Sequence, residues 1–140
     1  MIKFFKKIKP GVLYVITLAI ILYISLSSNP LNVRGFEWYY GSDKIIHAVM
    51  WGFLTMVMAY EVSKALYFFD PGWELYICMF LINSLLSVLI ELVQELMKIG
   101  RHFDIYDIVA NCAGVLVCGL VMKFFLMDWI AEKMDSIDDY

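Results

Sequence analysis

The sequence predicts an all-α membrane protein, built as a bundle of four transmembrane helices with both chain ends on the cytoplasmic side. Hydrophobic residues make up 62% of the 140 residues, charged residues make up 18%, and the mean hydropathy is +0.74. Four mostly apolar runs, each of about the length that crosses a bilayer as a helix, lie at about residues 11–28, 43–61, 74–98 and 105–127. Little of the chain lies outside these runs, so we expect one transmembrane domain.

The first predicted span follows a basic segment with four lysines between residues 3 and 9. A secretory signal peptide also places a basic region before an apolar one. The apolar run from Val12 to Ser27 is longer than a typical signal core, however, and a poor cleavage site follows it. We therefore expect an uncleaved first helix.

Loops with turn-forming residues separate the other spans. Residues 28–42 combine proline and glycine with four aromatic residues, which prefer the headgroup level of a membrane, and Ser42 is a candidate N-cap for the second span. Residues 70–72 have the turn sequence Asp-Pro-Gly before the third span. Gly100 interrupts the chain between the third and fourth spans.

The basic residues near the span ends predict the orientation. With the N-terminus inside, seven of them lie on the cytoplasmic side, and the four on the other side are Arg34, Lys44, Lys98 and Arg101. The chain then ends in an acidic cytoplasmic tail at residues 129–140. This acidic tail argues against nucleic acid as a partner.

The last three spans carry polar residues. A helix face in contact with lipid has no need of such residues. At 3.6 residues per turn, each set forms a stripe along one helix face. The stripes consist of Asp43 and His47 in the second span, Asn83, Ser87, Glu91, Gln94 and Lys98 in the third, with Glu95 at its border, and Asp104, Asp107, Asn111, Gly114 and Cys118 in the fourth. The charged ends of all three stripes lie toward the outer side in this topology, so we expect neighbouring helices to bring them together.

Depth in the membrane distinguishes among these residues. Glu91 lies about two turns, or roughly 10 Å, inside the outer end of its span, too deep for its carboxylate to reach the interface easily. Asn111 lies similarly deep. Capping of a helix start explains Asp43 and Asp104 about as well as a site role does, and Lys44 has the position of a lysine that extends to the membrane surface.

Three motifs along the stripes resemble those of a known family. They are D-K-x-x-H at Asp43, Lys44 and His47, E-x-x-Q at Glu91 and Gln94, and R-x-x-D-x-x-D-x-x-x-N-x-x-G at Arg101, Asp104, Asp107, Asn111 and Gly114. The pattern is similar to that of the VanZ-like family of small bacterial membrane proteins. The resemblance implies a multi-pass protein of the bacterial plasma (inner) membrane, in a family whose founding members are associated with resistance to the glycopeptide teicoplanin.

The residue types favour a polar, outward-facing site that binds or modifies an amphiphilic cell-envelope molecule, such as a lipid-linked precursor or a lipoglycopeptide. No Ser or Cys nucleophile motif, H-E-x-x-H motif or P-loop is present. The candidate catalytic residues are His47, Glu91 and Asp107, with His47 as general acid or base. The candidate ligand-binding residues are Asp43, Lys44, Gln94, Arg101, Asp104 and Asn111, and the fork of Arg101 suits a phosphate or carboxylate.

No cofactor is predicted. A divalent cation on His47, Glu91, Asp104 and Asp107 is chemically permissible, but the spacing of these residues is not diagnostic of a metal site. The sequence leaves the oligomeric state, the identity of the ligand and the occurrence of catalysis open.

The polar stripes also fit two different functions. Because polar side chains join membrane helices through hydrogen bonds, the chain could be a non-catalytic binding or scaffold module whose polar residues hold the bundle together. Gly114 and Cys118, four residues apart, predict a close approach of the fourth span to a neighbouring helix. A transporter is the third alternative, and four short helices would have to oligomerise to enclose a path.

Overall fold

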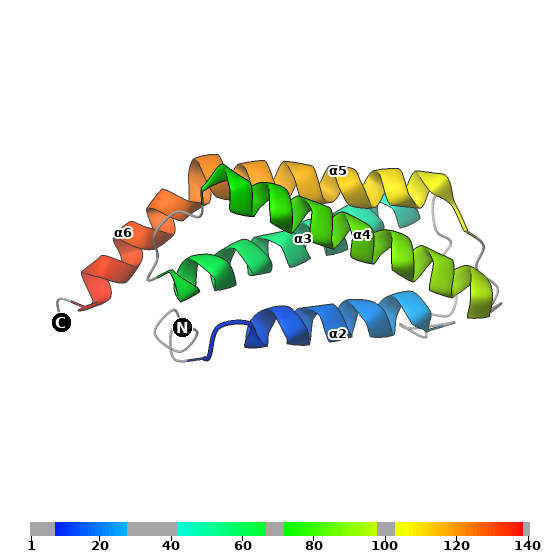
Figure 1. Ribbon diagram of the computed structural model, residues 1–140, viewed down its shortest axis with the longest axis horizontal. Coiled ribbons are helices and arrows are strands. Elements are labelled where there is room, and N and C mark those ends of the chain that lie inside the picture. Colours follow the sequence, from blue (N-terminus) through cyan, green and yellow to red (C-terminus); the bar gives the residue numbers. More distant parts are fainter. Residues whose placement is uncertain (1–7, 28–41, 67–71, 98–102, 139–140) are drawn as a thin grey trace.

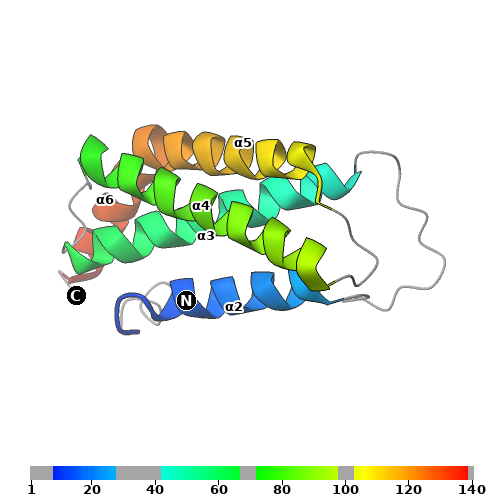
Figure 2. The ribbon, with the colours of Figure 1, turned by 45° about the vertical axis from the view of Figure 1, so that its right-hand side comes forward.

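The computed structural model describes residues 8–27, 42–66, 72–97 and 103–138, and every regular element in these ranges is helical. The elements are α2 (Val12–Leu26), α3 (Ser42–Ala65), α4 (Trp73–Met97), α5 (Ile105–Val121), the short π-helix η1 (Met122–Leu126) and α6 (Met127–Asp138). Helices α2 to α5 run alternately in opposite directions along one bundle axis (Figure 1). The first turns of α3 and α5 therefore lie at the same end of the bundle as the last turns of α2 and α4 (Figure 2).

Three stretches of the described chain are long and apolar enough to cross a membrane: Asp43–Ala65, Trp73–Met97 and Ile105–Glu132. Helix α2 is also apolar but has 15 residues, a length of about 22 Å against roughly 30 Å for the hydrocarbon core of a bilayer. The predicted count of four bundled helices fits the structure. Membrane crossing by α2 and the cytoplasmic location of both chain ends stay predictions.

Helix α3 packs most extensively against α5, at an interface of small residues. A Cβ added to Gly114 would meet the backbone of Ala48, including its Cα at 2.8 Å. A Cβ added to Gly52 would lie 2.6 Å from Cys118 Sγ and 3.0 Å from the Gly114 carbonyl oxygen. The close approach predicted from Gly114 and Cys118 is confirmed, and the neighbouring helix is α3.

Two hydrophobic cores lie at successive levels of the bundle. The first contains Ile21, Trp51, Leu54, Ile90 and Val115, contributed by all four bundled helices. The second contains Ala59, Tyr76, Met79, Met122 and Met127. Large apolar side chains elsewhere on the helices face outward, as in Leu81, Leu85 and Leu89 of α4. An apolar outer surface of this kind suits a lipid environment, in which packing rather than removal from water holds helices together.

A chain of hydrogen bonds crosses the interior near the middle of the bundle. Tyr14 Oη donates to Asn83 Oδ1 at 2.9 Å, and Asn83 Nδ2 donates to Thr55 Oγ1 at 3.0 Å. Asn83 is 0% exposed and Thr55 is 2% exposed. These three side chains, which we call the central polar layer, join α2, α3 and α4.

The last predicted span continues without a break into the predicted tail. Helix α5 passes through the π-helical turn η1 into α6, which extends to Asp138 and leaves the direction of α5 (Figure 1). A π-helical turn inserts an extra residue into the helical hydrogen-bond pattern, and such turns often accompany helix bends. Within residues 129–138, the tail is therefore a helix attached directly to the bundle.

Candidate functional site

Six polar side chains from three helices meet at one end of the bundle. They come from the first two turns of α3, from the N-cap and first two turns of α5, and from the C-terminal part of α4. The alternating helix directions place these segments together (Figure 2). We call them the polar cluster: Lys44, His47, Glu91, Asp104, Asp107 and Asn111. The convergence expected from the three sequence stripes is thus observed. The role of these residues in binding or catalysis stays a prediction.

Lys44 organises the outer level of the polar cluster. Its Nζ lies 2.7 Å from Asp104 Oδ2 and 2.8 Å from Asp107 Oδ1, while Asp43 Oδ2 lies further away, at 3.7 Å. Lys44 therefore pairs with the acid that caps α5 and with the acid in its first turn, and its extension to the membrane surface stays a prediction. The Asp43 side chain is 59% exposed and lies at the margin of the cluster.

Asp104 has a capping role and an ion-pairing role at once. Its Oδ1 accepts a hydrogen bond of 2.8 Å from the Tyr106 backbone N–H, which caps the start of α5. Its other oxygen accepts from Lys44. The hydrogen bond from the Lys44 ammonium, assisted by that from Tyr106, lowers the pKa of the Asp104 carboxyl below its ordinary value.

The inner level of the polar cluster lies around His47. His47 Nδ1 is 3.2 Å from Asn111 Oδ1 and 3.5 Å from Glu91 Oε1. The exposed fractions are 8% for His47, 1% for Glu91 and 0% for Asn111. Nδ1 can donate to the amide oxygen of Asn111 in the tautomer that has its proton on Nδ1. An imidazole, a carboxylate and an amide thus share a water-poor space in which electrostatic interactions are strong.

Asp107 links the two levels. One of its oxygens accepts from Lys44, and the ligand atoms of Asp107, His47 and Glu91 all lie within 4.8 Å of one another. Three helices therefore contribute one potential metal ligand or proton carrier each to a single point. The three residues predicted as catalytic thus lie close together, and their catalytic role stays a prediction.

The other polar residues singled out near this end of the sequence stripes have different surroundings. Gln94 Nε2 donates to the Ser25 carbonyl oxygen at 2.7 Å, so it joins α4 to the last turns of α2 instead of entering the polar cluster. Glu95 Oε2 accepts from the Phe103 backbone N–H at 2.8 Å, near the start of α5. Arg101, like Lys98, lies outside the described residues.

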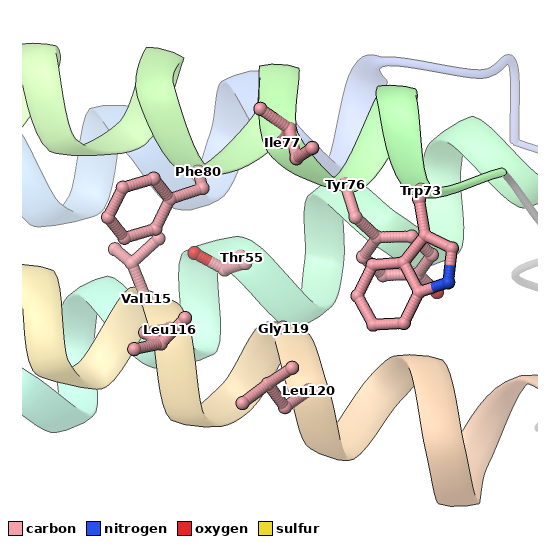
Figure 3. Close-up of a pocket in the computed structure, with 9 residues that line it drawn as sticks. All are labelled: Thr55, Trp73, Tyr76, Ile77, Phe80, Val115, Leu116, Gly119 and Leu120. Atoms are coloured by element: carbon pink, nitrogen blue, oxygen red, sulfur yellow. The ribbon is translucent and has the colours of Figure 1, made fainter.

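An apolar groove lies between α4 and α5, on the side of the bundle away from α2. Nine residues line it, and it encloses a cavity volume of about 160 Å³ (Figure 3). The lining residues are Thr55, Trp73, Tyr76, Ile77, Phe80, Val115, Leu116, Gly119 and Leu120. Phe80 and Val115 face one another at one end of this α4–α5 groove, and the Trp73 ring lies at the other (Figure 3). Val115 is one helical turn beyond Asn111, so the groove begins next to the polar cluster.

The sequence interpretation did not identify the groove or the remaining buried polar groups. The central polar layer was missed because Tyr14 and Thr55 are single polar positions in apolar runs. At the opposite end of α3, Lys64 Nζ lies 3.0 Å from Glu61 Oε1, and both side chains are almost fully buried. The i, i+3 spacing of Glu61 and Lys64 was the available signal for this pair.

Fold and cluster together define a helical membrane protein with a buried polar cluster at one end of its bundle. The comparison with protein families gives the same class and a name for it. The VanZ/LLP1 family model matches residues 5–126, and the chain therefore belongs to the VanZ/LLP1 family. Neither a search of curated proteins nor a search of solved structures found a match. The resemblance predicted from the D-K-x-x-H, E-x-x-Q and R-x-x-D motifs is confirmed.

Proposed function

We propose that this VanZ/LLP1-family protein binds an amphiphilic cell-envelope molecule at the plasma membrane of bacteria. The polar head of the molecule lies at the polar cluster, and its apolar tail lies in the α4–α5 groove. Lipid-linked cell-wall precursors and lipoglycopeptides such as teicoplanin have this combination of head and tail. The proposed link to glycopeptide resistance follows from the second of these ligands.

The observation that carries the proposal is the adjacency of two chemically opposite surfaces. The polar cluster ends on α5 at Asn111, and the groove lining begins on α5 at Val115, about 6 Å further along the helix. Ligand sites are typically apolar spaces with a few convergent polar groups that fix orientation. An amphiphile combines the two kinds of chemistry that these adjoining regions offer.

The acids and the cation of the cluster suit a head group with hydrogen-bond donors and an anionic part. Asp104 and Asp107 accept hydrogen bonds, while the Lys44 ammonium between them is a point charge for a phosphate or carboxylate. We propose that Arg101, which adjoins this end in the sequence, supplies a second cation.

We propose proton transfer as the chemistry of the inner level. His47 is the general acid or base, because a neutral imidazole can both accept and return a proton. Glu91, 3.5 Å from Nδ1, orients the ring and stabilises its charged form. Asn111 holds the ring from the same nitrogen.

A second candidate function is a non-catalytic scaffold, and the hydrogen bonds between helices support it. Lys44 joins α3 to α5, Gln94 joins α4 to α2, and Asn83 joins three helices. In this alternative the same polar residues would be required for folding alone. Binding measurements on folded variants separate the two functions.

The test uses purified full-length protein in lipid nanodiscs, with a polyprenyl-diphosphate-linked cell-wall precursor and teicoplanin as ligands. We expect saturable binding of at least one ligand to the unmodified chain, and a loss of at least tenfold in affinity in Glu91→Gln. The matched control is Glu95→Gln, one turn along the same helix, which we expect to bind normally. Mass spectrometry of the recovered ligand detects any modification. Equal binding by all three proteins would refute the assignment of the head-group site.

The tail site is tested on α5 with a second matched pair. Leu116→Trp places a large ring in the groove lining, whereas Val117→Trp places the same ring on a face of α5 outside that lining. Both positions are exposed, so both variants should fold. We expect weaker binding in Leu116→Trp only, and equal effects of the two substitutions would remove the groove from the account.

A further inference from the structure

We propose that the inner level of the polar cluster is a binding site for a divalent transition cation, Zn²⁺ or Mn²⁺, with His47, Glu91 and Asp107 as its protein ligands. The inference goes beyond the proposed function, because the cation needs no amphiphile in order to bind. Four observations carry it: the convergence of donor atoms, their burial, their chemical types and the surroundings of Asn111.

The donor atoms are close enough to share one ion. One ligand atom from each of His47, Glu91 and Asp107 lies within 4.8 Å of the other two. Ligands about 2.0–2.2 Å from a tetrahedral cation are separated by roughly 3.5 Å. The His47 Nδ1 to Glu91 Oε1 distance already has this value, at 3.5 Å. The remaining separations are at most 4.8 Å, which exceeds that value by about 1 Å.

The fold fixes these donors before any ligand arrives. They come from three different helices, and α3 and α5 are held together by the backbone contact at Gly114. The exposed fractions of His47, Glu91 and Asp107 are at most 9%. A buried, rigid set of anionic donors binds a cation more tightly than an exposed one, because water competes less and little conformational entropy is lost.

The donor types select the kind of cation. One imidazole nitrogen with two carboxylate oxygens suits Zn²⁺ or Mn²⁺, whereas Mg²⁺ and Ca²⁺ prefer oxygen ligands alone. The residue types in the sequence also permit Asp104 as a fourth ligand. Both oxygens of Asp104 are engaged, one by Lys44 and the other by the Tyr106 N–H, whereas Asp107 pairs with Lys44 through Oδ1. The group whose donor atoms converge is therefore His47, Glu91 and Asp107.

Asn111 provides an independent indication of a ligand. The residue is 0% exposed, and its Oδ1 lies 3.2 Å from His47 Nδ1. Its Nδ2 makes no hydrogen bond to any residue that the structure describes. Zinc sites with three protein ligands commonly hold a water in the fourth position, and such a water beside His47 would accept from Nδ2. With Nδ1 bound to the cation, it has no proton to donate to Asn111 Oδ1, and Asn111 would then be a positioning residue that orients the bound water through Nδ2.

The experiment uses the full-length protein in nanodiscs, stripped with a chelator and dialysed against ZnCl₂ or MnCl₂, without amphiphile. We expect one equivalent of Zn²⁺ or Mn²⁺ per chain by elemental mass spectrometry. Isothermal titration should show affinity at least 100-fold weaker in His47→Gln and Asp107→Asn, and about tenfold weaker in Asn111→Ala. Glu95→Gln should bind like the unmodified chain.

A second measurement on the unmodified chain covers the case in which these variants fail to fold. Zn²⁺ or Mn²⁺ should raise the Tm reversibly, and Mg²⁺ should not, because a ligand that binds only the folded state stabilises it. The absence of saturable binding by the unmodified chain would overturn the proposal, and so would undiminished binding by folded His47→Gln and Asp107→Asn. Amphiphile binding measured with chelator present tests the proposed function separately.

Discussion

Asn83 and Asn111 are both 0% exposed inside the same bundle, yet their surroundings differ. Asn83 accepts from Tyr14 through Oδ1 and donates to Thr55 through Nδ2, so both ends of its amide are hydrogen-bonded. Asn111 contacts His47 through Oδ1, and its Nδ2 makes no hydrogen bond within the described residues. The first amide completes a network, and the second leaves one donor available.

The difference indicates different uses of polar residues in one small bundle. The central polar layer contains no ionisable acid or base with an ordinary pKa near neutrality, and its hydrogen bonds join α2, α3 and α4. The polar cluster concentrates three carboxylates, an imidazole and an ammonium around α3 and α5. Stabilising a bundle does not require that many ionisable groups, since burying charges costs more than burying amides. We therefore interpret the layer as structural and the cluster as functional.

The largest expected effect is a loss of stability of the whole bundle, which disrupts the central polar layer and the polar cluster together. Gly114→Val places side-chain atoms against the Ala48 backbone and should destabilise the protein by about 3 kcal/mol or more. Thermal unfolding in detergent measures the effect. The matched control on the same helix is Gly119→Ala, because a Cβ there meets only Thr55 Cγ2 at 3.7 Å. Similar Tm values for the two variants would contradict the close α3–α5 contact.

The next largest effect is a loss of stability without a loss of binding, caused by a substitution in the central polar layer. Asn83→Ala removes the hydrogen bonds with Tyr14 and Thr55 and should cost about 2–3 kcal/mol. Binding of ligand or cation by the folded fraction should stay within about threefold of the unmodified protein. Tyr14→Phe removes one of the two bonds and should cost about 1 kcal/mol. Loss of binding in folded Asn83→Ala would show that the layer is part of the functional site.

Asn111→Ala should give the opposite profile. It removes one contact with His47, so we expect a cost of about 1 kcal/mol in the free energy of unfolding. Binding of the amphiphile should fall by at least tenfold, because the His47 ring loses a group that orients it. Parallel unfolding and binding measurements check both values. A variant with lower stability than Asn83→Ala and normal binding would reverse our assignment of the two asparagines.

The smallest expected effect is a pH dependence at the edge of the polar cluster. The Lys44 ammonium lowers the pKa of the Asp104 carboxyl from its ordinary value of 3.8. This ion pair therefore stabilises the folded state fully above about pH 4, and its contribution is lost as the pH falls through the lowered pKa. Comparing the Tm of the unmodified protein with that of Asp104→Asn between pH 3 and 6 tests this. The difference in Tm between the two proteins should be constant above pH 4.5 and shrink below pH 4. A difference in Tm that grows as the pH falls would exclude a stabilising Lys44–Asp104 ion pair.

Much of the architecture could be predicted because membrane helices follow simple rules. Runs of apolar residues placed α3, α4 and α5, and the 3.6-residue period placed Glu91, Asp107 and Asn111 on inward faces. Alternating helix directions then required their convergence at one end. The close helix contact at Gly114 was predictable from its spacing of four residues to Cys118. Only a small residue at position 114 permits the contact with Ala48.

Other features depend on partners that periodicity does not specify. Gln94 lies on the predicted stripe but donates to the Ser25 carbonyl oxygen of α2. The pairing of Lys44 with Asp104 and Asp107 depends on how closely α3 and α5 approach at this end. The central polar layer involves Tyr14 and Thr55, whose pairing depends on the relative heights of three helices. The α4–α5 groove depends on how the side chains of its lining pack against one another, and the helical period does not specify that packing.

Photo-crosslinking tests the central claim most directly, namely that the polar cluster and the adjoining groove bind one amphiphile. The probe is a polyprenyl-diphosphate-linked precursor with a diazirine in its tail, added to the protein in nanodiscs. We predict crosslinks concentrated at groove residues such as Leu116 and Leu120, displaced by excess unlabelled precursor and strongly reduced in Glu91→Gln but not in Glu95→Gln. Crosslinks spread evenly over all apolar helix faces, with no competition and no dependence on Glu91, would contradict the account.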